Sequence, residues 1–247
     1  MGSSPPDSPI RVGVLLFPGH EPLDWVAPVN IWGAVKDADG RPRIEMLYIA
    51  ENAGPVTSVT GTVSVIASYS FADLPPPAAS PQHSPSANGR PATPPSPPSH
   101  QQLHWLLVPG GIGTRREAAN PALLEYIRAW AAPSSGLQLC MSVCTGAALL
   151  AAAGALDGRR ATSNKRAFDW VKSVNPRVDW VRSARWVRDG NFVTSSGVSA
   201  GADMAVHVLK EVLGAEVAAK AAQYAEYIPA TDADKDPFAD EAFLPAV

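Results

Sequence analysis

Short runs of apolar residues alternate with amphipathic segments along most of this chain. The run RVGVLLF, residues 11–17, is apolar after its arginine and ends at Pro18-Gly19, which is typical of a strand buried on both faces. A helical pattern follows over residues 24–36, where Pro28 is tolerated only within the first turn. Residues 137–154, LQLCMSVCTGAALLAAAG, begin like a buried strand and end like an Ala/Leu helix.

The remaining segments continue this alternation. Residues 56–60 and 62–67 are β-branched runs separated by Gly61, which predicts a hairpin. Further strands are expected at 44–50, 104–108, 178–181, 184–187 and 192–194, and further helices at 121–132, 165–174, 199–213 and 215–227. Strands that alternate with helices imply right-handed βαβ crossovers. We therefore predict an α/β fold with a doubly wound, mostly parallel, flavodoxin-like sheet.

Two segments depart from this pattern. Residues 75–98 hold ten of the 25 prolines, and no large apolar residue occurs there, so the segment cannot bury enough surface to order itself. We expect one domain over residues 10–230, interrupted by a disordered surface insertion at 75–100. A Pro-rich ligand for a partner domain is the alternative interpretation of that insertion. The acidic tail, residues 231–247, is expected on the surface, with Phe238 and Phe243 as the side chains able to pin it.

Composition and charge exclude several classes of function. A formal net charge of -3 with scattered Lys and Arg gives no basic surface for nucleic acid. The first ten residues lack the basic and apolar regions of a secretory signal, so a cytoplasmic location is expected. No charge falls between Arg128 and Asp157, yet polar side chains and three glycines in that stretch argue against a membrane span.

The two cysteines, Cys140 and Cys144, lie four residues apart in the predicted strand. At about 3.3 Å per residue their Cα atoms would be about 13 Å apart, beyond the limit of about 7 Å for a disulfide. We expect two free thiols. The five histidines are dispersed, so no zinc-ligand spacing exists and no metal is predicted.

The segment SVCTG, residues 142–146, has the small-x-nucleophile-x-Gly spacing of a strand-to-helix nucleophile elbow. At such a turn Cys144 would face the unpaired N–H groups of the following helix, which favour an anion and lower the pKa of a thiol. The competing interpretation is a small buried apolar residue, which we assign to Cys140. Cys144 is the predicted nucleophile.

A glycine-rich loop and a carboxylate follow two other predicted strands. In VPGGIGT, residues 108–114, glycines let backbone N–H groups approach a reacting atom, so the amides of Gly111 and Thr145 are candidate oxyanion donors. A dinucleotide fingerprint is disfavoured because Arg116 replaces its third glycine. Asp24 is either a plain helix N-cap or, beside a thiolate, a protonated acid–base group, with Glu21 as the competing carboxylate.

Four segments together resemble the ThiJ/PfpI superfamily, which is related to class I glutamine amidotransferases. They are FPGHEPLDWVAP, LLVPGGIGT, MSVCTGAALLAAAGALDGRRATSN and VRDGNFVTSSGVSAGADMAVHVL. Thr145 directly after the cysteine and Asp24 in the first βα loop are similar to the isocyanide hydratase branch. The resemblance implies a cysteine nucleophile, an aspartate acid–base group, no cofactor and a homodimer.

The chain also departs from relatives in this superfamily. Protease-like members have His after the cysteine, where this chain has Thr145, and many relatives read ATTHW where this chain reads ATSNK. Asn164 therefore occupies the place of a histidine, and the amidotransferase triad is missing. His20 flanks the first loop and is expected on the surface rather than in catalysis.

Residues and resemblance together predict that Cys144 attacks the terminal carbon of an isocyanide and that hydration gives an N-substituted formamide. In this hypothesis Asp24 donates a proton and then activates water, and the Thr145 hydroxyl orients Asp24 or the water. The side chains expected to line the pocket for this small electrophilic substrate are Trp25, Asn164, Ser196 and Trp186. The alternatives are a redox or ligand sensor without turnover, and a glyoxalase or deglycase, against which the missing histidine counts.

Overall fold

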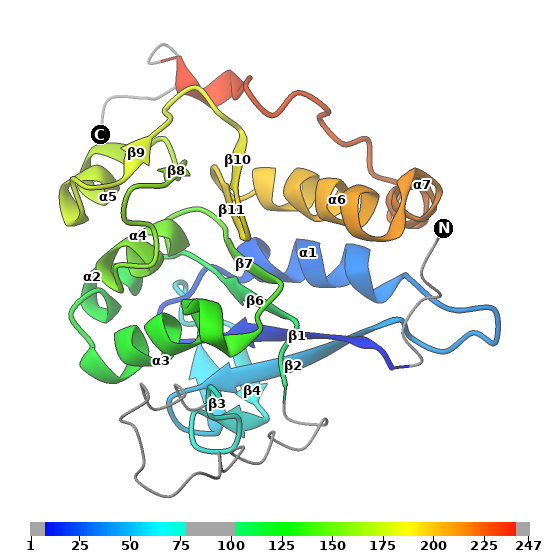
Figure 1. Cartoon of the computed structure of the whole chain (residues 1–247), viewed down its shortest axis with the longest axis horizontal. Coiled ribbons are helices and arrows are strands. Elements are labelled where there is room, and N and C mark those ends of the chain that lie inside the picture. The colour runs from blue at the N-terminus through cyan, green and yellow to red at the C-terminus, as the bar shows by residue number, and fades with distance from the viewer. Residues whose placement is uncertain (1–7, 78–101, 241–247) are drawn as a thin grey trace, which may run out of the picture.

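The computed structural model of this protein describes residues 8–77 and 102–240. Its centre is a seven-stranded sheet in the order β10-β11-β7-β6-β1-β2-β5 (Figure 1). The strands are β1 (Ile10–Leu15), β2 (Ile44–Ala50), β5 (Tyr69–Ser70), β6 (Trp105–Val108), β7 (Leu139–Ser142), β10 (Trp186–Asp189) and β11 (Phe192–Ser195). All neighbours are parallel except β10, which runs antiparallel to β11.

The five central strands have the order expected of a flavodoxin-like fold. Side by side in the sheet these strands are β2, β1, β6, β7 and β11. When they are renumbered one to five along the chain, this is the doubly wound order 2-1-3-4-5. Their runs are mostly apolar because helices cover both faces, and all four residues of β6 are buried. The predicted α/β, mostly parallel sheet is confirmed. Ligands of such sheets bind beyond the carboxyl ends of the strands, near the switch point between β1 and β6.

Helices form a layer on each face of the sheet (Figure 1). One layer holds α1 (Pro22–Gly33), α6 (Ala200–Leu213) and α7 (Ala215–Tyr224). The other holds α2 (Thr114–Glu117), α3 (Pro121–Ala131), α4 (Gly146–Ala152) and α5 (Phe168–Val174). Two 3-10 turns lie at Pro133–Ser135 and Pro237–Ala239. The α1 layer packs Trp32 against Trp105 of the sheet, with ring centroids 5.5 Å apart.

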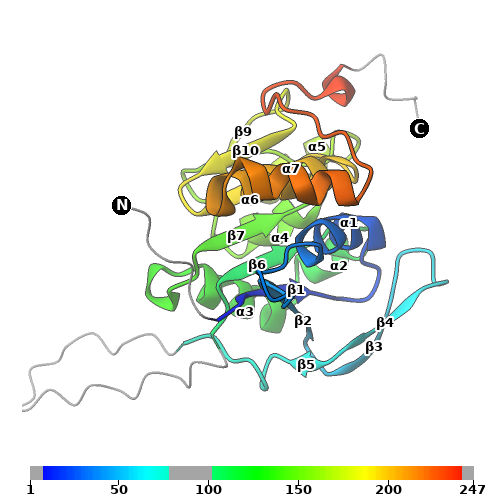
Figure 2. The same ribbon diagram turned by 90° about the vertical axis from the view of Figure 1, so that its right-hand side faces the viewer.

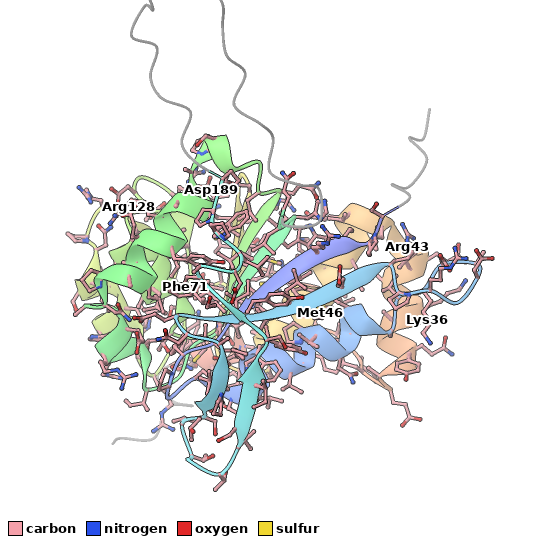
Figure 3. All side chains as sticks on the ribbon, turned by 90° about the horizontal axis from the view of Figure 1, so that it is seen from below. Lys36, Arg43, Met46, Phe71, Arg128 and Asp189 are labelled. Atoms are coloured by element: carbon pink, nitrogen blue, oxygen red, sulfur yellow. The ribbon has the colours of Figure 1, made fainter. Side chains whose placement is uncertain are left out.

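Smaller elements lie at the edges of the sheet. The predicted hairpin forms as β3 (Gly54–Thr57) and β4 (Ser64–Ala67), which pair antiparallel and project beyond β5 in Figure 2. A second short pair, β8 (Arg160–Ala161) with β9 (Asp179–Trp180), is parallel and separate from the main sheet. Phe71, labelled in Figure 3, follows β5 and stacks on Tyr126 of α3 at 4.0 Å between ring centroids.

Helix α1 begins earlier than predicted, and its proline lies further inside. Glu21 is the N-cap, since its side chain accepts a hydrogen bond from Leu23 N, and Pro22 occupies the first turn. Pro28 therefore lies in the second turn and removes the donor that would have bonded the carbonyl of Asp24. The expectation that Pro28 stays within the first turn was wrong.

The described part of the acidic tail, residues 231–240, lies mostly at the surface as expected, and Asp236 is the one buried residue among them. Figure 1 shows the segment after α7, drawn in red, running back across β10 towards β9. Asp236 of this segment is buried, whereas Phe238 is 48% exposed. Among residues 231–240, the buried carboxylate of Asp236 rather than the ring of Phe238 therefore holds the segment. Phe243 and residues 78–101 of the predicted insertion lie outside the described residues.

Within residues 8–77 and 102–240, no helix is both long enough and apolar enough to cross a membrane.

Candidate functional site

Cys144 occupies the sharp turn between β7 and α4. Its φ of 57° is left-handed, an uncommon conformation for a residue with a side chain, and small neighbours are needed for such a turn. Two bonds hold the backbone of the residue: its N–H donates to Ser196 O at 2.9 Å, and Ser163 Oγ donates to its carbonyl at 2.8 Å. The strand-to-helix elbow inferred from the sequence is thus present in the backbone.

Asp24 points away from the start of its own helix and into the loop after β6. Because Glu21 caps α1, the Asp24 carboxylate is available for another partner, and Gly110 N donates to its Oδ2 at 2.8 Å. The side chain is fully buried. Loss of solvation raises the pKa of Asp24 to about 7, the Gly110 N–H opposes this rise, and the charge of Glu21 adds to it. Asp24 can therefore gain or lose a proton near neutral pH.

The thiol of Cys144 is in a less favourable electrostatic environment than the sequence suggested. The residue is only 7% exposed, and both burial and the neighbouring charge of Asp24 raise its pKa. The N–H and hydroxyl groups of Thr145 oppose this rise. The expected lowering of the thiol pKa by α4 is wrong on balance, because desolvation outweighs the bonds at the end of a seven-residue helix. Cys144 and Asp24 influence each other's pKa and must be treated as one titrating pair.

The glycine loop after β6 brings the elbow and Asp24 together. A Cβ placed on Gly110 would lie 2.5 Å from Thr145 N and 2.9 Å from Asp24 Oδ2, so both groups converge on this glycine. The Gly111 N–H donates to Thr145 Oγ1 at 3.0 Å. In this state the Gly111 amide is used to fix Thr145, and the Thr145 amide lies beside the sulfur.

The other expected pocket residues have different surroundings. Trp25 is buried, donates from Nε1 to His20 Nδ1 at 3.0 Å and packs edge-on against Tyr48. Asn164 Oδ1 accepts from Ala167 N at 3.1 Å, and its amide nitrogen lies close to Gly197.

Ser196 and Trp186 lie on the β10–β11 side of the site. The backbone of Ser196 holds Cys144, while its hydroxyl donates to Asp236 of the C-terminal segment. Trp186 is buried against the ring of His207. The structure therefore brings together four of the predicted site residues: Cys144, Asp24, Thr145 and Gly111. The side chains of the other four contact groups outside this set: Asn164, Ser196, Trp25 and Trp186.

His20 is buried, contrary to the expected surface position. Its ring accepts the Trp25 indole N–H, and the loop around it bonds the β3–β4 hairpin through Val59 N to His20 O at 2.9 Å. Burial lowers the pKa of His20, so the neutral ring is favoured. Tertiary contact with a hairpin over 30 residues away could not be inferred from the local sequence.

Sequence reasoning missed Thr114 and Ser163. Thr114 is fully buried, and its Oγ1 donates to Gly111 O at 2.7 Å and lies 3.1 Å from Thr145 Oγ1. Ser163 holds the Cys144 carbonyl. Both are small hydroxyl residues inside segments that carry the family resemblance, which is the only sequence signal for them.

Both cysteines are free thiols, as predicted, and no cluster of three or more metal-ligating side chains occurs in residues 8–77 or 102–240.

Comparisons with known proteins find relatives that cover most of this chain. The chain is 29% identical to an isonitrile hydratase of Pseudomonas putida over 227 residues, which are 91% of this chain and 82% of that protein. A deglycase of Pyrococcus abyssi is 38% identical over 90 residues, covering 36% of this chain and 51% of that one. The crystal structure of a ThiJ/PfpI family protein from Pseudomonas syringae superposes with a TM-score of 0.69 at 24% identity, covering 94% of this chain and 83% of that one.

A family model described as DJ-1/PfpI matches residues 10–211, which include all three segments that meet at Cys144. The fold, the strand-to-helix elbow at Cys144 and this match agree. The resemblance inferred from the motifs is confirmed, and this chain belongs to the DJ-1/PfpI family.

Proposed function

We propose that this protein hydrates an isocyanide to an N-substituted formamide, with Cys144 as nucleophile and Asp24 as acid–base group. The observation that carries the proposal is the buried Asp24, whose pKa is raised to about 7 and whose Oδ2 is fixed by Gly110 at the cysteine elbow. A group that exchanges protons at neutral pH beside a thiol is what this addition requires. The similarity to an isonitrile hydratase over 91% of the chain supports the choice of substrate class.

The first step forms a carbon–sulfur bond. In the reactive state the Cys144–Asp24 pair holds one proton, which starts on the thiol because its pKa is raised. Sulfur attacks the terminal isocyanide carbon while Asp24 takes the thiol proton and passes it to that carbon. The product is a thioimidate, S–CH=N–R, and Asp24 is ionised again.

The second step releases the product. Asp24 takes a proton from water as the water oxygen attacks the thioimidate carbon, and gives that proton to the nitrogen. The carbon–sulfur bond then breaks, and the remaining hydroxyl proton returns through Asp24 to sulfur. The result is a formamide and a free thiol, so no redox partner is needed. Thr145, held by Gly111, keeps the elbow in place during both steps.

A panel of alkyl and aryl isocyanides tests this proposal, with formamide quantified by mass spectrometry. The native protein should form formamide, and Cys144→Ala should form none. Asp24→Asn keeps the size of the side chain and should lose about 10²- to 10⁴-fold in rate. Cys140→Ala is the matched control and should retain activity, because Cys140 is buried in β7. Absence of formamide from the native protein, or full activity of Cys144→Ala, would overturn the proposal.

The alternatives receive less support from the geometry. Oxidant-sensing cysteines are typically exposed and have a low pKa, whereas Cys144 is 7% exposed and its pKa is raised. The similarity to a deglycase covers only 36% of this chain. Incubation with methylglyoxal distinguishes that activity, because it would yield lactate.

A further inference from the structure

The C-terminal segment places a buried carboxylate near the nucleophile elbow. The side chain of Asp236 is 0% exposed, and it accepts a hydrogen bond from Ser196 Oγ. Its two oxygens also lie 3.5 Å from Lys165 Nζ and 3.5 Å from Arg185 Nη1. A charged side chain is rarely fully buried unless it is paired, so these contacts determine the position of Asp236.

Two of these side-chain partners of Asp236, Ser196 and Lys165, belong to the two loops that hold Cys144. Ser196 accepts the Cys144 N–H through its backbone carbonyl, and Ser163 donates its hydroxyl to the Cys144 carbonyl. Lys165 Nζ bonds the carbonyl of Ser163 at 3.3 Å and also faces Asp236. Asp236 therefore connects the loop on the N–H side of Cys144 to the loop on its carbonyl side.

The segment that carries Asp236 is itself fixed to the fold. Arg185 N donates to Ala233 O at 2.8 Å, and Asp236 N donates to Ser183 O at 2.8 Å. Arg185 Nε also pairs with Asp203 Oδ2 at 2.5 Å. Two cations, Lys165 and Arg185, thus face two carboxylates in a charge-balanced buried cluster.

We propose that Asp236 is a positioning residue for Cys144. A non-glycine residue at φ 57° is strained, and such strain persists only where the surroundings over-determine the backbone. Ser196 and Ser163 supply the bonds to both peptide groups of Cys144, and Asp236 holds the loops of these two serines in fixed positions relative to each other. The proposal concerns the backbone of Cys144 and holds whichever electrophile the sulfur attacks.

Hydrogen exchange of the full-length protein without substrate tests this assignment. In Asp236→Ala the Cys144 amide should exchange about tenfold faster than in the wild type, while amides of β1 keep their rates. Asp236→Asn should show a smaller effect, because its amide oxygen still accepts from Ser196 Oγ. This graded local response separates positioning from a general loss of stability, which would accelerate exchange throughout the sheet.

Asp234→Asn is the matched control, because Asp234 is exposed, lies two residues away and carries the same charge. Its Cys144 amide should exchange as in the wild type. If Asp236→Ala does not fold, the Lys165→Met, Asp236→Asn double variant keeps the cluster charge-balanced and takes its place. Wild-type exchange of the Cys144 amide in a folded Asp236 variant would overturn the assignment, whether or not any isocyanide is hydrated.

Where turnover is observed, Asp236→Asn should lower kcat and leave KM unchanged, because Asp236 makes no contact with the reacting atoms. A rise in KM alone would contradict a positioning role.

Discussion

The backbone N–H of Gly110 donates a 2.8 Å hydrogen bond to Asp24 Oδ2, across 86 positions of sequence. The other oxygen of this carboxyl group, Oδ1, is buried and has no backbone hydrogen bond within the described ranges, and the Cys144 thiol interacts with this carboxyl group. One oxygen is thus fixed and the other is left for a proton. This asymmetry suits a group that exchanges a proton with a substrate.

The pH dependence of activity should follow Asp24. The doubly protonated pair has no base to accept the thiol proton, so kcat/KM for an isocyanide should rise with pH through about 7. In Asp24→Asn this rise of kcat/KM with pH should disappear, along with most of the activity. Initial rates at constant ionic strength between pH 5 and 9 measure it. A native profile that is flat across pH 7 would exclude Asp24 as the titrating group.

The free energy of unfolding should also depend on pH through Asp24, and this contribution should fall as the pH rises. The pKa of Asp24 is raised from 3.8 to about 7 on folding, so the folded protein binds a proton that the unfolded chain releases. The resulting stabilisation is fully present below pH 3.8 and is lost as pH rises through about 7. The free energy of unfolding of the wild type, minus that of Asp24→Asn, should fall by about 4 kcal/mol across this range. Urea titrations of both proteins at several pH values measure this difference, and a constant difference would contradict the raised pKa.

Gly110→Ala should damage the site more than an ordinary glycine substitution does. The new Cβ would lie 2.5 Å from Thr145 N and 2.9 Å from Asp24 Oδ2, so one of these groups must move. We expect a loss of about 1–3 kcal/mol in the free energy of unfolding and a large loss of activity. Gly33→Ala in α1 is the control, since a Cβ there meets nothing within 4 Å. It should be neutral or slightly stabilising by urea denaturation. Equal effects of the two substitutions would argue against the close approach at Gly110.

Thr145→Val should uncouple the glycine loop from the elbow. Its hydroxyl accepts the Gly111 N–H at 3.0 Å, and valine would leave that donor without this bond. The expected cost is about 1–3 kcal/mol of stability together with a lower kcat. Thr145→Ser keeps the hydroxyl and should restore most of both. Thermal unfolding and formamide assays compare the two variants, and a Thr145→Val protein as stable and as active as the wild type would show that this hydrogen bond does not couple the loop to the elbow.

Local pattern was sufficient for most of the sheet and for the strand-to-helix turn at Cys144. The apolar runs at β1, β2 and β6 and the SVCTG turn were predicted from residue types alone, because buried parallel strands and strand-to-helix elbows restrict composition. Shorter elements such as β5 and β8 were missed. Each has two residues, which is too short for a periodic pattern, and only pairing with a distant strand defines them.

The chemistry of the site depended more on tertiary structure. The sequence suggested Asp24 as an acid–base group but left it open whether Asp24 caps its helix, and the bond of Glu21 to Leu23 N settled that question. The expected lowering of the Cys144 pKa was wrong, because the helix end is a local feature whereas burial is set by the whole fold.

The sequence by itself determined the α/β class, the family resemblance and the segment that carries Cys144, since these follow from local periodicity and short-range spacing. Only the tertiary structure decided that His20 is buried, that Gly110 holds Asp24, and that Asp236 lies among Lys165, Arg185 and Ser196. Burial and charge pairing between segments far apart in the chain arise when the sheet closes and the helices pack, so no local pattern encodes them.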